Sequence, residues 1–222
     1  MKTKDFLKKH DACTRGAKWA LAIGDDMADV WDAMIEHGKH EWLLWTATRP
    51  GVFSDSVLRK LACRFVRETP LSDGRKVWDL LTDERSRNAV EVVEVYADGK
   101  AAKEDMDAAY ATAYAAARAA YAAARAAFAA FAAARDAAYA ASDAAYAAAY
   151  AADAAARAAY AASDDVTYAA YAASDAARAA YAAARAAYAA SDDVARDAAY
   201  AAYDAAKAAQ VRMIAELGNP FK

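Results

Sequence analysis

The amino-acid sequence predicts an all-α protein, in which a small Trp-rich helical domain precedes a very Ala-rich region of long helices. Three observations support this fold class. Positions 108–209 hold 61 alanines in 102 residues, and alanine has the highest helix propensity of all residues. No glycine or proline lies between Gly99 and Gly218. The first hundred residues are divided into short segments by residues that start and stop helices.

Three short helices are expected in this first part. The first spans Asp25 to His37, where early aspartates complement the helix dipole and a glycine follows. The second covers His40 to Thr48 and ends before an Arg-Pro-Gly turn. The third begins at Ser54-Asp55, carries apolar residues at helical spacing and closes near Pro70.

Large aromatic residues supply the core that these helices need. Trp31, Trp42, Trp45 and Trp78 are expected to cover the apolar face of the third helix, since each removes much apolar area from water. Residues 84–97 alternate Val and Glu as a strand does, yet no second strand is available for pairing. We therefore expect a helix at this place.

The alanine tract predicts helices with two different surfaces. On a helical wheel its Tyr, Phe, Arg and Asp residues cover about two thirds of the circumference and leave a strip of alanine. A methyl-lined strip lets helix axes approach to the short end of the usual range of about 8–10 Å. An Arg four residues after a Tyr, as at Tyr114 and Arg118, Tyr121 and Arg125, or Tyr181 and Arg185, can lie against the ring.

Ser-Asp pairs are the candidate turns of the tract. Tyr-Ala-Ala-Ser-Asp starts at Tyr139, Tyr160, Tyr171 and Tyr188, and Ser-Asp favours helix N-termini. Breaks there would give antiparallel helices in tight contact, which is the arrangement that we favour; an unbroken helix would be a rod of roughly 150–170 Å. The expected domains are 1–100, a Trp-rich helical domain; 101–217, an alanine-rich bundle or rod; and 218–222, a C-terminal tail.

Composition argues against several classes of function. The net charge of −3 and a pI near 5.7 give no reason to expect nucleic acid as a partner. Charges recur throughout the alanine tract, so no membrane span is expected. Two cysteines make no disulfide framework, and no signal-peptide core is present. These features predict a cytoplasmic protein.

No strong catalytic or metal-binding motif is present, so we expect a non-enzymatic protein without cofactors or metals. His37 and His40, with Glu36 and Glu41, form a His-carboxylate cluster with spacing that can hold a metal. Gly38 interrupts that ligand face. Histidines are favourable at the C-terminal end of a helix, and this explains the cluster more simply than metal binding does. Cys63 lies on the apolar side of its helix and is expected in the core, and the aspartates of the tract are expected to cap helices.

The first hundred residues carry a resemblance to a known family. Its elements are Trp19 with Ile23-Gly24-Asp25, then Val30-Trp31-Asp32-Ala33, Glu41-Trp42-Leu43-Leu44-Trp45 and Leu61-Ala62-Cys63-Arg64, followed by the Ala/Tyr/Arg tail. This pattern resembles the fifth-type-immunity-like proteins of bacterial polymorphic toxin systems, which also occur in phage genomes. The resemblance covers most of the chain and implies a protein that binds and blocks a toxin or another effector without catalysis.

The leading hypothesis is therefore a protein that neutralises a partner protein by occupying its surface. Trp, Tyr and Arg dominate interface hot spots, and the candidate contacts are Tyr114, Arg118, Tyr121, Arg125, Trp42 and Trp45. A structural alternative is a homo-oligomer in which alanine strips of several chains form the seam. Another is ice binding, although the regularly spaced Thr residues of helical antifreeze proteins are missing: only Thr112 and Thr167 occur in the tract.

Overall fold

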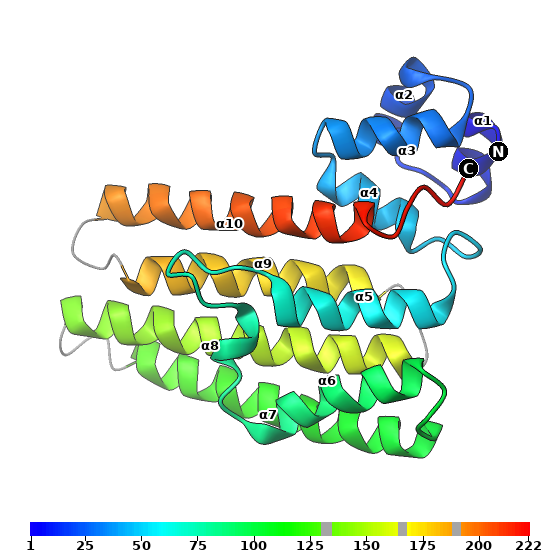
Figure 1. The fold of residues 1–222 in the computed structure, drawn as a ribbon. Helices are drawn as coiled ribbons and strands as arrows, with labels where there is room; N and C mark the ends of the chain where they lie inside the picture. Colours follow the sequence, from blue (N-terminus) through cyan, green and yellow to red (C-terminus); the bar gives the residue numbers. More distant parts are fainter. Residues whose placement is uncertain (130–134, 164–167, 188–191) are drawn as a thin grey trace.

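The computed structural model describes residues 1–129, 135–163, 168–187 and 192–222, and these residues form helices joined by turns (Figure 1). The predicted all-α fold is confirmed for this part of the chain. In chain order the elements are α1 Thr3–Lys9, α2 Thr14–Ile23, α3 Met27–Glu36, α4 His40–Ala47, α5 Asp55–Glu68, the 3-10 helix η1 Val77–Leu80, α6 Glu84–Ala97, α7 Lys103–Ala129, α8 Arg135–Ser163, α9 Tyr168–Ala187 and α10 Asp192–Ala215.

Side-chain caps begin the short helices where the sequence predicts them. A carboxylate oxygen of Asp26 accepts a hydrogen bond from the Ala28 amide at 3.0 Å and starts α3. The Ser54 hydroxyl accepts one from the Val57 amide at 3.4 Å and starts α5. After α3 the chain reverses at Gly38, whose φ of +57° is a conformation that glycine adopts without strain.

Residues 84–97, in which Val and Glu alternate, form helix α6 as expected. One face of this helix packs against the bundle. Val90 and Val93 are fully buried in α6. Glu94, on the following position, instead meets Arg67 of α5. The alternating pattern therefore places valines inward at helical spacing, although it reads like a strand over a short window.

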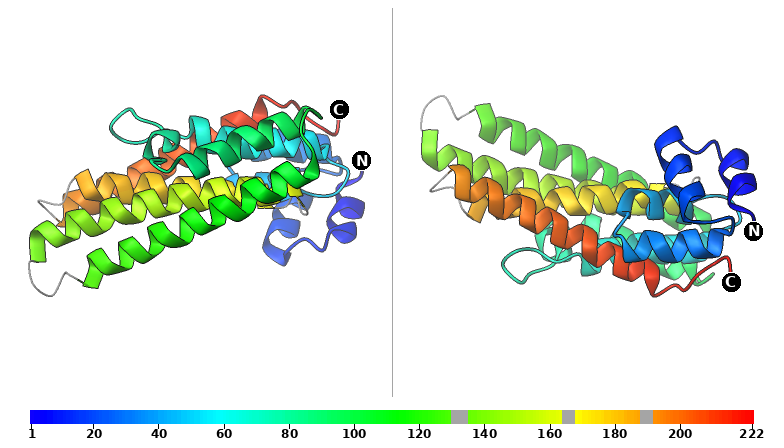
Figure 2. Two further views of the ribbon diagram at one scale, coloured as in Figure 1. Left: turned by 90° about the horizontal axis from the view of Figure 1, so that it is seen from below. Right: turned by 90° about the horizontal axis from the view of Figure 1, so that it is seen from above.

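Helices α7, α8, α9 and α10 run antiparallel and lie side by side, with the N-terminal helices at one end (Figures 1 and 2). The tract is therefore a bundle and not a single rod. Helix α8 is packed against α5, α6, α7 and α9, and six of its alanines between positions 151 and 158 are buried. Among the described residues, none of the helices combines the length and apolar character that crossing a bilayer requires.

Only two of the four Ser-Asp pairs mark helix boundaries. Helix α8 ends at Ser163 and α10 begins at Asp192, whereas positions 164–167 and 188–191 lie outside the described residues. Ser142-Asp143 and Ser174-Asp175 lie inside α8 and α9, so the prediction of turns there is wrong. The physical reason is that Asp143 pairs with Arg185, and Asp175 with Arg157, between the two helices.

A further boundary falls between Ala129 and Arg135, where the sequence has no Ser-Asp pair. Arg185 pairs with Asp143 at 3.4 Å, which shows that the guanidinium expected against Tyr181 has another role. Tyr181 and Arg185 are four residues apart on α9, as the sequence predicts, but Arg185 pairs with the carboxylate of Asp143 on α8. Interhelical partners thus decide what these repeated residues do.

Two large clusters of buried residues form the core. One contains Trp31, Phe6 and Phe65, together with Ile214 of α10, and Trp42 and Trp45 pack at its edge. The other joins α5, α6 and the alanines of the bundle, and Trp78 packs against this second cluster. The single core expected around all four tryptophans is thus divided. Both clusters contain residues from each side of position 100, and the division into domains there stays a prediction.

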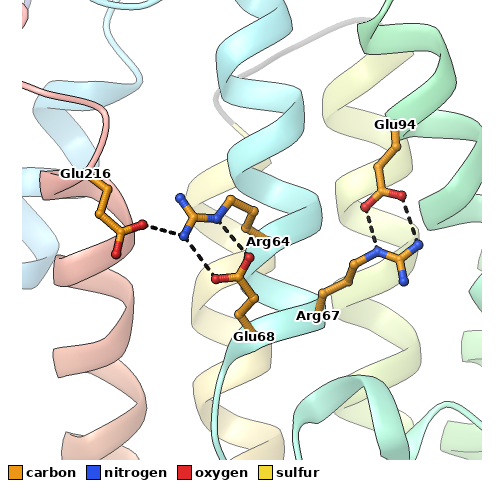
Figure 3. A network of polar contacts seen from close by, with 5 residues as sticks. All are labelled: Arg64, Arg67, Glu68, Glu94 and Glu216. Atoms are coloured by element: carbon orange, nitrogen blue, oxygen red, sulfur yellow. Dashed lines mark hydrogen bonds and ion pairs between the residues drawn. The ribbon is translucent and has the colours of Figure 1, made fainter.

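Two arginines of helix α5 form a charged network with α6 and with the segment that follows α10 (Figure 3). The Arg64 guanidinium makes two hydrogen bonds to Glu68, at 2.9 and 3.0 Å, and one of 2.6 Å to Glu216. Arg67 donates to both oxygens of Glu94 on α6, at 2.6 and 2.9 Å. These bonds lower the pKa of Glu68 and raise that of Arg67. The bidentate pair between Arg67 and Glu94 fixes the orientation of α5 against α6.

Candidate functional site

Three cavities meet around α4, where it crosses α10 and faces α2. Their volumes are about 630, 400 and 280 Å³. Glu41 lines all three cavities, and Trp42 and Trp45 each line two of them. We call this region, made of Trp19, Trp42 and Trp45 with the three cavities, the tryptophan face. It is the candidate binding site.

The indole rings are brought together by helix packing. Trp42 and Trp45 are three positions apart on α4 and therefore share one face of that helix. Trp19 arrives from α2, and its ring lies 5.3 Å from that of Trp42 at an angle of 47°. Phe6 of α1 meets Trp45 edge to face at 6.1 Å. All three tryptophans are half-buried, so part of each side chain stays accessible.

Cationic side chains lie over these rings. The Arg15 guanidinium is 5.8 Å from the centre of Trp42, and Lys39 lies between Trp19 and Trp42 at 5.9 and 5.8 Å. Arg49 lies 5.0 Å from the Trp45 ring and donates a 3.0 Å hydrogen bond to the carbonyl oxygen of Trp45. A cation above an aromatic face is stabilised by roughly 0.5–1 kcal/mol at an exposed site. These contacts therefore orient the cations without neutralising them.

His40 forms the buried floor between the two larger cavities. Its Nε2 atom lies 2.6 Å from Oε1 of Gln210, whose Nε2 donates to the Ala173 carbonyl at 2.7 Å. Because the amide nitrogen is used in that bond, Oε1 accepts and His40 carries its proton on Nε2. Burial lowers the pKa of His40 to about 4. The imidazole is thus neutral near pH 7 and connects α4, α9 and α10.

A second polar cluster lies inside the bundle, and its Arg157 guanidinium is 5.4 Å from the ring centre of Tyr171, which lines the cavity of about 400 Å³. Arg157 is 2.9 Å from a carboxylate oxygen of Asp153 and 2.6 Å from one of Asp175. Burial, followed by the charge of Asp153, raises the pKa of Asp175 to about 7. Tyr121 from α7 lies near both carboxylates, and burial raises its pKa above the ordinary value. This cluster joins α7, α8 and α9 within the alanine seam.

The six predicted contact residues fall in different places. Trp42 and Trp45 lie together on the tryptophan face. Tyr114 is 46% exposed on α7, with the Arg118 guanidinium 5.9 Å from its ring centre. Tyr121 is half-buried and meets Tyr150 of α8 edge to face at 5.8 Å, so its ring is part of the helix packing. The side chain of Arg125 lies outside the described residues. Figure 1 shows α7 and α4 on different sides of the molecule.

The other residues considered for chemistry have structural surroundings. His37 ends α3, and its ring meets Trp19 edge to face at 6.3 Å. Cys63 is buried, its Sγ lies 3.7 Å from the Val90 carbonyl oxygen, and burial raises the pKa of the thiol. Cys13 is exposed, and both cysteines are free. In the part of the chain that the structure describes, no group of three or more His, Cys, Asp or Glu side chains is arranged to hold a metal.

Sequence reasoning missed Arg15, Lys39 and Arg49 as members of the site, and also the bond between His40 and Gln210. Gln210 is the only glutamine in the chain and stands near the end of the alanine tract, which is the one signal that could have drawn attention to it. Comparisons with protein-family models, with curated proteins and with solved structures find no match. The resemblance to immunity proteins therefore stays a prediction.

Proposed function

We propose that this chain is a non-catalytic binding protein that neutralises a toxin or another effector by covering part of its surface with the tryptophan face. The observation that carries this proposal is the combination of three half-buried indoles, cations held over their rings and cavities between them. Tryptophan, tyrosine and arginine supply most of the binding energy at protein interfaces. Cavities beside them can receive side chains of a partner.

The surroundings of the indoles support recognition more than mere core packing. A tryptophan that only fills a core is covered by apolar side chains, as Trp31 is, with none of its surface exposed. Trp42 and Trp45 instead border open cavities and lie beneath Arg15 and Arg49. Their rings are held in place before any partner arrives, which reduces the ordering cost of binding.

The chemistry at the tryptophan face also favours binding. His40 is neutral near pH 7, and its Nε2 proton is engaged by Gln210. Cys63 is buried in another part of the core. A nucleophile with an adjacent base is the usual requirement for covalent catalysis, and the exposed thiol of Cys13 has no histidine beside it in the cavity that it lines.

Growth protection tests the proposal. The chain would be co-expressed with a panel of bacterial toxins, and any toxin whose toxicity is relieved would be titrated with the purified chain by calorimetry. Trp42→Ala combined with Trp45→Ala should abolish protection and weaken binding at least tenfold, since hot-spot truncations cost about 2 kcal/mol or more.

Trp78→Ala provides the matched control. Trp78 is also half-buried beneath two arginines, Arg67 at 4.1 Å and Arg87 at 5.5 Å, but it packs against the other core cluster. Thermal melts would first establish that each variant folds. Failure of every toxin in the panel to be relieved, or protection that survives loss of both Trp42 and Trp45, would contradict the proposal.

A further inference from the structure

We propose that the tryptophan face binds an acidic segment of a partner protein and takes one bulky apolar side chain of that segment into the cavity between α1, α2 and α4. This inference rests on the proposed function and adds the chemistry of the partner. Three observations carry it: cations without carboxylate partners, an apolar cavity beside them, and acidic side chains placed where they oppose a nucleic acid.

The first observation is an excess of cations in the lining of the three cavities, which holds Arg15, Lys39, Arg49, Lys207 and Arg212 against Glu36, Glu41 and Asp204. Elsewhere, Arg67 and Arg157 each form an ion pair shorter than 3 Å with a carboxylate of another helix. Arg15, Lys39 and Arg49 have no carboxylate within ion-pair distance among the described residues, whereas Lys207 pairs with Glu41 at 3.6 Å. In a chain with a net charge of −3, the lining of these cavities therefore carries an excess of positive over negative side chains.

The second observation is the smallest of the three cavities, of about 280 Å³. Leu7, Ala12, Ala20 and Met34 line it together with the indoles, and the Thr46 hydroxyl is directed to Met34 Sδ at 3.8 Å. Glu41 is the one charged residue in its lining, and no cation lines this cavity. A carboxylate would lose its hydration there without compensation, whereas a leucine or phenylalanine side chain would gain the free energy of apolar burial.

The cations and the apolar cavity would bind different parts of a partner segment. The rim of the face offers Arg15, Lys39 and Arg49, and acidic side chains of a partner can pair with them while remaining hydrated. The cavity below takes an apolar side chain from between those acids. An aspartate- or glutamate-rich segment with a single large apolar residue has the matching order of charges and apolar surface.

The third observation distinguishes protein from nucleic acid. Glu36, Glu41 and Asp204 line the largest cavity beside the cations. A nucleic acid places a phosphate at every nucleotide and would meet these carboxylates along its path. A peptide can place neutral residues opposite them. The side-chain order of a protein segment therefore fits the surface better than a regular polyanion.

Synthetic peptides and the native Cys13 thiol provide the test. A twelve-residue peptide of Glu and Ser with a central Leu would be compared with versions in which Ser replaces the Leu or Lys replaces every Glu, and with a twelve-nucleotide oligothymidine. Cys13 lines the apolar cavity and is exposed, whereas Cys63 is buried. Alkylation of Cys13 therefore reports directly on occupation of the cavity.

The acidic Leu peptide should bind, slow the alkylation of Cys13 and lose affinity as salt rises. Replacing its Leu by Ser, or combining Arg15→Gln with Lys39→Gln, should weaken binding by about tenfold or more. Arg87→Gln is the matched control, because Arg87 also lies over an indole, that of Trp78, away from the tryptophan face. It should leave the affinity of the acidic peptide unchanged.

Equal binding of the Lys peptide, tighter binding of the oligothymidine, or binding of the acidic peptide without protection of Cys13 would overturn the inference. So would failure of the acidic Leu peptide to bind while the Trp42→Ala and Trp45→Ala variant still loses toxin protection. In that last case the proposed function stands and only the partner chemistry is rejected. If the acidic Leu peptide does not bind and the Trp42→Ala and Trp45→Ala variant still protects against the toxin, the proposed function is rejected as well.

Discussion

At the scale of single residues, Asp175 and His40 are buried ionisable side chains whose pKa values the fold shifts in opposite senses. Burial and the neighbouring Asp153 raise the pKa of Asp175 to about 7, and burial lowers that of His40 to about 4. The groups facing Asp175 are Asp153 and Arg157 on α8, Arg178 on its own helix and Tyr121 on α7. Both shifts link folding stability to pH.

These shifts predict opposite slopes of stability against pH. The folded state holds a proton on Asp175 that the unfolded chain releases near its ordinary pKa of 3.8, so this contribution is present at low pH and is lost as pH rises to about 7. The folded state excludes a proton that the unfolded chain binds on His40 near 6.5, so this contribution is lost as pH falls from about 6.5 toward 4.

Urea unfolding across this pH range would separate the two contributions. With His40→Gln, the change in stability from pH 4.5 to pH 7.5 should be more negative than in the parent chain by on the order of 2 kcal/mol, because the opposing contribution of His40 is removed. With Asp175→Asn, stability should instead rise over the same range. Identical slopes in both variants would show that neither side chain controls the pH dependence.

At the scale of helices, alanine packing decides how closely α8 and α9 approach. Ala155 and Ala176 are fully buried, on α8 and α9 respectively, whereas Ala201 is exposed on α10. Where two backbones approach over methyl groups, no space remains for a larger side chain. The seam therefore depends on small size more than on the apolar area that each residue contributes.

Enlarging a seam alanine should be costly, while the same change on the surface should not. Ala155→Leu is expected to lower the free energy of unfolding by about 1–3 kcal/mol or more. Ala201→Leu provides the same chemical change at an exposed helical position and should stay within about 0.5 kcal/mol of the parent chain. Chemical denaturation of both variants measures the difference; a tolerated leucine at position 155 would argue against close alanine packing.

The sequence predicts α3, α4, α5 and α6 because caps, glycines and apolar spacing act locally, but it does not single out α1, α2 or η1. Asp26 and Ser54 cap α3 and α5 where expected. It does not predict that Ser174-Asp175 continues α9, since that depends on Arg157 from another helix. The same limit applies to the site. Trp42 and Trp45 are three residues apart, so their shared face can be predicted, but the approach of Arg15 and Trp19 is set by tertiary packing.

At the scale of the whole molecule, most alanines of the tract whose burial the structure describes in α8 and α9 are covered by neighbouring helices. Helix α8 is packed by four other helices, and both ends of the chain are fixed near α3: Lys222 Nζ lies 2.8 Å from Asp32, and the Met1 amino group 3.5 Å from Asp26 (Figure 1). The longest helix described, α8 with 29 residues, corresponds to a length of about 44 Å. The alternative of a homo-oligomer joined through alanine strips requires a surface that this packing largely uses up.

Small-angle X-ray scattering over a concentration series is the direct test of this arrangement. We expect the mass of a single 23.6 kDa chain and a maximum dimension far below the roughly 150–170 Å of a continuous helix. Because the alanine seam is satisfied inside the chain, mass should not increase with concentration. An oligomeric mass would revive the structural alternative, in which seams form between chains. A monomer of rod length would mean that the alanine strip is exposed to solvent, and the ice-binding alternative could then be examined by thermal hysteresis.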